Sequence, residues 1–276
     1  MSGQGVRAAL LAALRREGLD TVEGAFAYLG GTELNKDGLG HRRRTRLELT
    51  DEDGRAHVLY LKRYDAEAPV DTLRCWMTHG WGRSRARVES DNIRAARRAG
   101  IPTMRSVLWG EQSMGRVGRR SFLIVTAVPG DAMERSLEGF LLAHAGDGRV
   151  AEVTRRLARV VRRLHDSGHV HRDLYASHVF LDDSADEPRI HLIDLARMFA
   201  PRWRRFRWYI KDLAQLKYSM PAAWVEQSWQ QFLAEYLVGV DAEAVGGFDA
   251  AIDRKVASIR RRAERRRARA DRGRRP

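Results

Sequence analysis

The residue pattern of this 276-residue chain changes once, near Pro129-Gly130, and that change limits the folds open to it. Before it, short runs of β-branched and aromatic residues alternate with turn sequences such as Lys36–Gly40 and Asp51–Gly54, a pattern typical of antiparallel hairpins. After it, apolar residues recur at helical spacing over longer stretches. We therefore expect an α+β, bilobal fold: a β-rich lobe, a connecting segment and a mainly helical lobe.

The first lobe is predicted to contain five antiparallel strands and one helix. Arg83–Ala99 has no helix breaker and stops at Gly100-Ile101-Pro102, as a helix end should. The strands are expected at Thr32–Lys36, Arg43–Thr50, His57–Tyr64, Ser106–Trp109 and Ser121–Val128. Helices of the second lobe are expected at Val150–His165, Lys211–Tyr218 and Trp224–Leu237. The predicted parts are an N-terminal helix (1–24), the first lobe (25–129), the second lobe (130–252) and a basic tail (253–276).

The charge of the chain is concentrated at its end. Of a formal net charge of +14, most comes from Asp253–Pro276, which holds twelve basic and three acidic residues. Such a tail can bind anionic lipid headgroups, form a solvated charged helix or bind nucleic acid. The sequence leaves these three interpretations open.

Cysteine content and hydropathy restrict the compartment. The chain has one cysteine, Cys75, so no internal disulfide framework is possible, and no His/Cys cluster has zinc-ligand spacing. The longest apolar stretches, Ala8–Leu14 and Phe122–Pro129, are far shorter than the roughly 20 residues that span a bilayer. We expect a cytoplasmic protein without a signal peptide or transmembrane helix.

Two aspartates lie in a sequence context that suits phosphoryl transfer. Asp173 ends the loop sequence His171-Arg172-Asp173, and Asp194 follows two short predicted strands. Carboxylates at the edges of a tight hairpin can point the same way, one to accept a hydroxyl proton and the other to bind a metal ion on phosphates. Asp173 is the predicted catalytic base, and Asp194 the predicted magnesium ligand.

This order of residues resembles the protein-kinase family, with Asp173 in its catalytic loop and Asp194 as its metal-binding aspartate. The resemblance implies that Lys62, late in the third strand, contacts the α- and β-phosphates of ATP and is oriented by Glu89 on the following helix. It implies that Asp212 holds the catalytic loop by accepting backbone N–H bonds. Three further residues are predicted to contact the nucleotide: Gly38, Gly40 and Val128.

Two differences from ordinary protein kinases indicate a more specific family. His178 stands where the catalytic loop's metal-binding asparagine would be, and Leu195-Ala196-Arg197 replaces a Phe-Gly pair. Both look like the bacterial lipopolysaccharide kinase (Kdo/heptose kinase) family, which the chain resembles over roughly residues 25–240. This implies ATP and Mg²⁺ as cofactors, with His178 beside Asp194 at the metal, and a sugar hydroxyl of the lipopolysaccharide inner core as acceptor.

The segment after Asp194 is expected to border the acceptor. Arg202–Trp208 interleaves arginine and tryptophan, a composition that suits an anionic saccharide, although a basic surface loop held by core tryptophans has the same composition. With the basic tail, it predicts peripheral association with the anionic cytoplasmic face of the inner membrane. Nucleic acid is not an expected partner, and the sequence identifies no protein partner.

Three alternatives remain open. A Ser/Thr protein kinase would share the catalytic loop, and a silent scaffold would explain His178 and the incomplete glycine loop. A nucleic-acid-binding protein would use the basic tail but leaves Lys62, Glu89, Asp173 and Asp194 without a role.

Overall fold

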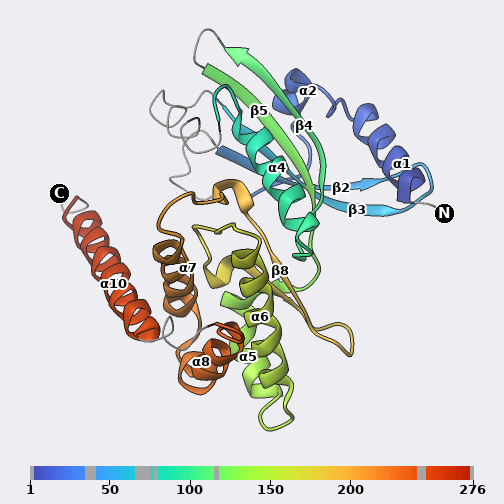
Figure 1. The fold of residues 1–276 in the computed structure, drawn as a ribbon. Coiled ribbons are helices and arrows are strands. Elements are labelled where there is room, and N and C mark those ends of the chain that lie inside the picture. Colours follow the sequence, from blue (N-terminus) through green and yellow to red (C-terminus); the bar gives the residue numbers. More distant parts are fainter. Residues whose placement is uncertain are drawn as a thin grey trace. The chain divides into compact units, whose positions relative to one another are not determined.

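The computed structural model describes residues 3–34, 42–65, 76, 80–114, 118–240 and 247–273, and it divides the chain into two compact units (Figure 1). The first unit holds residues 1–98 and 103–128, and the second holds residues 99–102 and 129–276. Each unit is described by itself. The predicted glycine turn with Gly38 and Gly40 lies outside the described residues.

The first unit is built on a five-stranded antiparallel sheet in the order β1-β2-β3-β5-β4, which confirms the predicted sheet. The strands are β1 (Thr32–Glu33), β2 (Arg42–Thr50), β3 (Ala56–Tyr64), β4 (Ser106–Met114) and β5 (Gly118–Thr126). Strand β4 runs five residues further than predicted, because its polar end pairs with β5 up to Met114 opposite Gly118. The helices of this unit are α1 (Gly3–Arg16), α2 (Val22–Ala27) and α4 (Arg85–Arg98).

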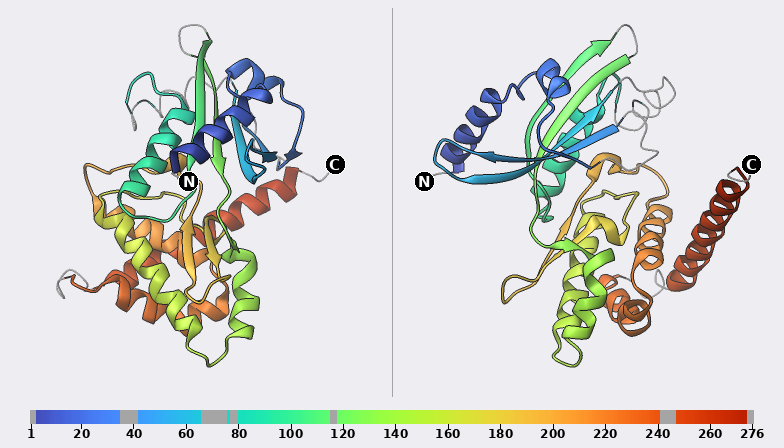
Figure 2. Two further views of the ribbon diagram at one scale, coloured as in Figure 1. Left: turned by 90° about the vertical axis from the view of Figure 1, so that its right-hand side faces the viewer. Right: turned by 180° about the vertical axis from the view of Figure 1, so that it is seen from behind.

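Side chains of β3 alternate between two environments, as the pleat of a strand requires. Leu59 and Leu61 join the apolar core formed with α1 and α2, while Lys62 and Tyr64 contact Glu89 of α4. Figure 2 shows α1 and α2 on one face of the sheet and α4 on the other. The alternation therefore delivers Lys62 to the helix that carries Glu89.

The second unit is mainly helical around a small three-stranded sheet. Its sheet has the order β6-β7-β8, with β6 (Asp131–Ala132), β7 (Val179–Asp182) and β8 (Arg189–Leu192). Its helices are α5 (Met133–Ala143), α6 (Arg149–Asp166), α7 (Arg205–Ser219), α8 (Ala222–Tyr236), α10 (Phe248–Gly273) and the short 3-10 turns η1 (Ala176–His178) and η2 (Leu195–Arg197). The predicted fold class is confirmed.

Helix α6 forms the centre of this unit through a single apolar stripe. Val153, Leu157, Val161 and Leu164 are fully buried, at the helical spacing of three to four residues that the sequence predicted. Helix α8 packs on α6, and α10 runs beside α7 (Figure 2). Among the described residues, no helix combines the length and apolar character needed to cross a bilayer.

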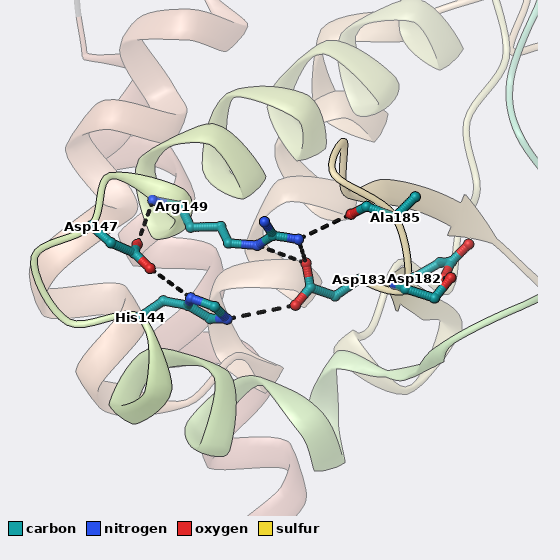
Figure 3. A network of polar contacts seen from close by, with 7 residues as sticks. His144, Asp147, Arg149, Asp182, Asp183 and Ala185 are labelled. Carbon is teal, nitrogen blue, oxygen red and sulfur yellow. Dashed lines mark hydrogen bonds and ion pairs between the residues drawn. The ribbon is translucent and has the colours of Figure 1, made fainter.

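The β7–β8 hairpin is anchored by a polar network at the α5–α6 connection (Figure 3). Arg149 Nε donates to Asp183 Oδ1 at 2.9 Å, and its Nη2 donates to the Ala185 carbonyl at 3.0 Å. His144 Nδ1 and Asp147 Oδ2 are 2.7 Å apart, and the Arg149 backbone N–H donates to the same carboxylate at 2.8 Å. These bonds lower the pKa of Asp147, the Arg149 amide contributing most. The hairpin that separates His178 from Asp194 is thereby fixed at its tip.

Gly130, directly after the connecting Pro129, has a role that no other residue could fill. Its φ is +80°, and a Cβ there would lie 2.0 Å from the Leu181 carbonyl oxygen. Glycine avoids both the strained backbone and the clash.

Candidate active site

A buried carboxylate holds the loop that carries Asp173 in place. Asp212, on α7 and fully buried, accepts the backbone N–H of His171 at 2.6 Å and that of Arg172 at 2.9 Å. These are the bonds predicted for Asp212 from the sequence. Arg172 adopts a positive φ of 71°, a conformation that costs energy and persists only where the surroundings fix it. The two hydrogen bonds to one carboxylate supply that constraint.

His171 ties the same loop to the segment before Asp194. Its Nε2 lies 3.0 Å from the Ile193 carbonyl oxygen, which can only accept, so Nε2 carries the proton. Burial lowers the pKa of His171, since it disfavours the charged ring. A neutral His171 therefore links the catalytic loop to the residue next to Asp194.

Asp173 is paired with a residue to which the sequence analysis gave no role. Arg197 Nη1, in η2, donates to both carboxylate oxygens of Asp173 at 2.9 Å. The two residues are 24 positions apart, and the sequence offered no signal for the contact beyond the presence of a cation three residues after Asp194.

Asp194 and His178 lie close enough to share a metal ion. His178 Nε2 is 3.7 Å from Asp194 Oδ2, and its Nδ1 is 2.8 Å from the backbone oxygen of Asp173. Because that oxygen accepts, Nδ1 carries the proton in the neutral ring and Nε2 keeps its lone pair on the side of Asp194. This is the tautomer that a metal-ligating histidine requires. The described residues contain no cluster of three or more His, Cys, Asp or Glu with metal-site geometry, so these two ligands would depend on phosphate oxygens and water to complete the shell.

The backbone at Asp194 is unusual as well. Asp194 has φ 58° and ψ 57°, the left-handed conformation that non-glycine residues rarely adopt. This turn lies between β8 and η2. Asp194 and Arg197 therefore lie on one short segment.

A cluster of aromatic and basic side chains surrounds Arg172. The Arg172 guanidinium lies over the rings of Phe199 and Trp208, at 5.2 and 5.5 Å from their centroids. Lys211 Nζ donates to the Arg172 carbonyl at 2.6 Å and also lies 5.6 Å from the Trp208 ring centroid. Burial lowers the pKa of Lys211 from 10.5 to about 8. These contacts hold the arginine of the His-Arg-Asp sequence in place.

Only the first part of the arginine–tryptophan segment is a loop, and the rest is helical. Arg205 to Trp208 form the first turn of α7, because the helix continues toward the N-terminus beyond the predicted Lys211. Trp208 packs against Phe199, while Trp203 is 82% exposed and Phe206 is half exposed. Trp203, with the arginines beside it, is therefore the part of the segment open to a ligand.

The first unit contains the predicted lysine–glutamate pair. Lys62 Nζ donates to Glu89 Oε1, and Tyr64 Oη donates to Glu89 Oε2 at 2.5 Å. Lys62 and Glu89 are both buried. Arg97, on the same helix as Glu89, donates to the Thr103 carbonyl at 3.1 Å. Val128 lies just after β5, half-buried, at the end of this unit.

Together, the two units have the fold and the residue order of the protein-kinase-like class. Residues 33–236 match the model of a family described as "Lipopolysaccharide kinase (Kdo/WaaP) family". The chain belongs to this family. The matched range includes Lys62, Glu89, Asp173 and Asp194, and it ends before α10.

Individual relatives agree with that assignment. The chain is 34% identical over 146 residues to the lipopolysaccharide core heptose(I) kinase WaaP of Pseudomonas aeruginosa, covering 49% of this chain and 52% of the relative. It is 32% identical over 139 residues to the heptose(I) kinase WaaP of Escherichia coli, covering 48% and 51%. The chain thus spans about half the length of the curated relatives it matches.

A solved structure covers more of the molecule. The structure described as "WaaP in complex with acyl carrier protein" matches with a TM-score of 0.66 and 25% identity, over 89% of this chain and 95% of that chain.

Proposed function

We propose that this chain is an ATP-dependent kinase that transfers the γ-phosphoryl group to a sugar hydroxyl, of heptose or Kdo, in the lipopolysaccharide inner core. The observation that carries the proposal is the catalytic-loop geometry: Asp173 on a loop fixed by Asp212, with Asp194 and His178 beside it. The family to which the chain belongs supports a sugar hydroxyl as acceptor.

The proposed reaction is an in-line displacement. The acceptor oxygen forms a bond to the γ-phosphorus, the bond from that phosphorus to the bridging oxygen breaks, and ADP leaves with the electron pair. Asp173 orients the acceptor hydroxyl and takes its proton. Lys62, oriented by Glu89, contacts the α- and β-phosphates, and Val128 and the glycines Gly38 and Gly40 contact the nucleotide. Asp194 and His178 would hold Mg²⁺, whose chemistry here is neutralisation of phosphate charge.

The first experiment is transfer of labelled γ-phosphate from Mg·ATP to dephosphorylated lipopolysaccharide core, to a generic protein and to no acceptor. Wild type is compared with Asp173→Ala, for which we expect a loss of about 10²–10⁴-fold in kcat with ATP binding retained. Label in the glycolipid that disappears in the variant supports the proposal. Label in protein favours a Ser/Thr protein kinase, and ATP binding without transfer favours a silent scaffold.

Peripheral binding to the anionic cytoplasmic face of the inner membrane is the second part of the proposal. Seven exposed arginines lie on the outer half of α10: Arg260, Arg261, Arg262, Arg265, Arg266, Arg267 and Arg269. The first half of α10 packs on the rest of the second unit. Its Asp249 accepts a hydrogen bond from Trp229 Nε1 at 2.9 Å. Replacing these arginines with glutamine should abolish sedimentation with phosphatidylglycerol vesicles and leave phosphate transfer to a soluble acceptor intact. A loss of transfer with retained vesicle binding would contradict this role and leave nucleic acid to be tested as a ligand.

A protein partner can be tested in the same preparation. Because the structurally similar WaaP was solved in complex with acyl carrier protein, we propose acyl carrier protein as a candidate partner for this chain. Coexpression followed by size-exclusion chromatography should give one complex, and two separate peaks would exclude it under those conditions.

A further inference from the structure

Arg197 lies at the proposed base in a geometry that suggests more than a surface ion pair. Its Nη1 is 2.9 Å from both Asp173 oxygens, so the carboxylate is held symmetrically by one nitrogen. Within the described part of the chain, the Nε and Nη2 groups of Arg197 make no hydrogen bond, and the side chain is 50% exposed. A planar guanidinium with donors left over is suited to anionic oxygens.

The other cations near Asp173 are already committed. Lys211 Nζ donates to the Arg172 carbonyl, and the Arg172 guanidinium contacts the rings of Phe199 and Trp208. The loop from Leu174 to His178 has no lysine or arginine. Arg197 is therefore the cation in direct contact with the Asp173 carboxylate, and it keeps donors for an incoming phosphoryl group.

Electrostatics gives such a cation a specific task. In the proposed reaction, the Asp173 carboxylate and the γ-phosphate, both negative, must approach the same hydroxyl oxygen, and their repulsion opposes the approach. A guanidinium that contacts the carboxylate and reaches the phosphoryl oxygens offsets this repulsion where charge develops during transfer.

We propose that Arg197 positions Asp173 for the acceptor hydroxyl and binds the phosphoryl group during its transfer. This inference rests on the proposed function and adds a residue to it. Arg197 undergoes no covalent change: the hydroxyl proton goes to Asp173 and ADP leaves with the electron pair, as above. The left-handed turn at Asp194 is what places Arg197 there, three residues after the proposed metal ligand.

The test compares Arg197→Ala and Arg197→Lys with wild type in the labelled-phosphate assay, with ATP hydrolysis measured in parallel. For Arg197→Ala, we expect kcat to fall about 100- to 1,000-fold while KM for ATP changes less than about threefold. Arg197→Lys should restore part of kcat. Guanidinium ion at tens of millimolar should raise the activity of Arg197→Ala and not that of Asp173→Ala, a rescue that a purely structural role would not give.

Arg159→Ala is the matched control. Arg159, on α6, is 59% exposed and ion-paired at 2.6 Å with Glu235 of α8, and neither residue is proposed for the reaction, so its loss should leave kcat unchanged. If Arg197→Ala lowers the melting temperature, the test rests on Arg197→Lys instead. An Arg197→Lys protein that folds as wild type does and has no higher kcat than Arg197→Ala contradicts the proposal.

Several outcomes overturn the inference. Transfer by Arg197→Ala within about threefold of wild type would exclude the role, and faster transfer would show that the pair is inhibitory. If wild type fails to phosphorylate the sugar acceptor but hydrolyses ATP, the proposed function fails while the hydrolysis rates of the variants still decide the role of Arg197. A wild type without either activity overturns both.

Discussion

Two ion pairs, one in each unit, hold residues proposed for phosphoryl transfer, and they differ in burial. Lys62 and Glu89 join β3 to α4, their side chains only 9% and 0% exposed, and Tyr64 donates to the same carboxylate. Arg197 and Asp173 join two short loop segments, with side chains 50% and 22% exposed.

The difference in burial separates a pair with fixed geometry from a pair that can change its contacts. Removing one partner of a buried pair leaves a charge without solvent or counterion, so the buried pair is fixed for as long as the unit is folded. An exposed pair exchanges its contacts with water and salt at little cost. The second pair can therefore exchange its contacts readily, while the first holds Lys62 in one orientation.

Breaking the buried pair should have the largest effect on stability. Glu89→Ala removes the buried carboxylate that accepts from both Lys62 and the Tyr64 hydroxyl, and we expect the unfolding free energy to fall by about 3–5 kcal/mol. Urea denaturation followed by circular dichroism measures this. Asp91→Ala is the control, because Asp91 lies on the same helix and pairs with Arg83 at the surface. Equal losses in the two variants would contradict the comparison.

The burial of Lys211 is intermediate between those of the two pairs. Its contribution to stability should depend on pH. Burial lowers its pKa to about 8 in the folded protein, whereas the ordinary value is 10.5. Between these values the unfolded chain binds more protons than the folded one, so stability from this group rises as pH increases from about 8 to 10.5 and is reduced below pH 8. The stability of wild type relative to Lys211→Met should therefore increase over that interval. A difference independent of pH would show that Lys211 keeps its ordinary pKa.

Breaking the exposed pair should have the smallest effect on stability. We expect Arg197→Ala to change the unfolding free energy by no more than about 1 kcal/mol. Even that difference should shrink at 1 M salt, where the screening length is about 3 Å. Urea titrations at low and high salt, with Arg159→Ala as reference, test this. A loss above about 2 kcal/mol would mean that Arg197 is a structural residue.

Much of the fold was predictable because it depends on local pattern. The run of β-forming residues predicted the strand in which Lys62 lies late, and the unbroken stretch before Gly100 predicted the helix with Glu89. The apolar stripe of α6 was visible at its helical spacing of three to four residues. The start of α7 was misplaced by six residues, since Arg205, Phe206, Arg207 and Trp208 have a composition equally suited to a loop.

The sequence by itself determined the change from strands to helices, the residues of the His-Arg-Asp loop and the family resemblance, because periodicity and short motifs are properties of neighbouring residues. Only the tertiary structure decided that Arg197 contacts Asp173 and that Arg172 lies over the rings of Trp208 and Phe199. Those contacts depend on the left-handed turn at Asp194 and on the packing of α7 against the loop that carries Asp173. Side chains distant along the chain meet only after the backbone between them has taken its folded path.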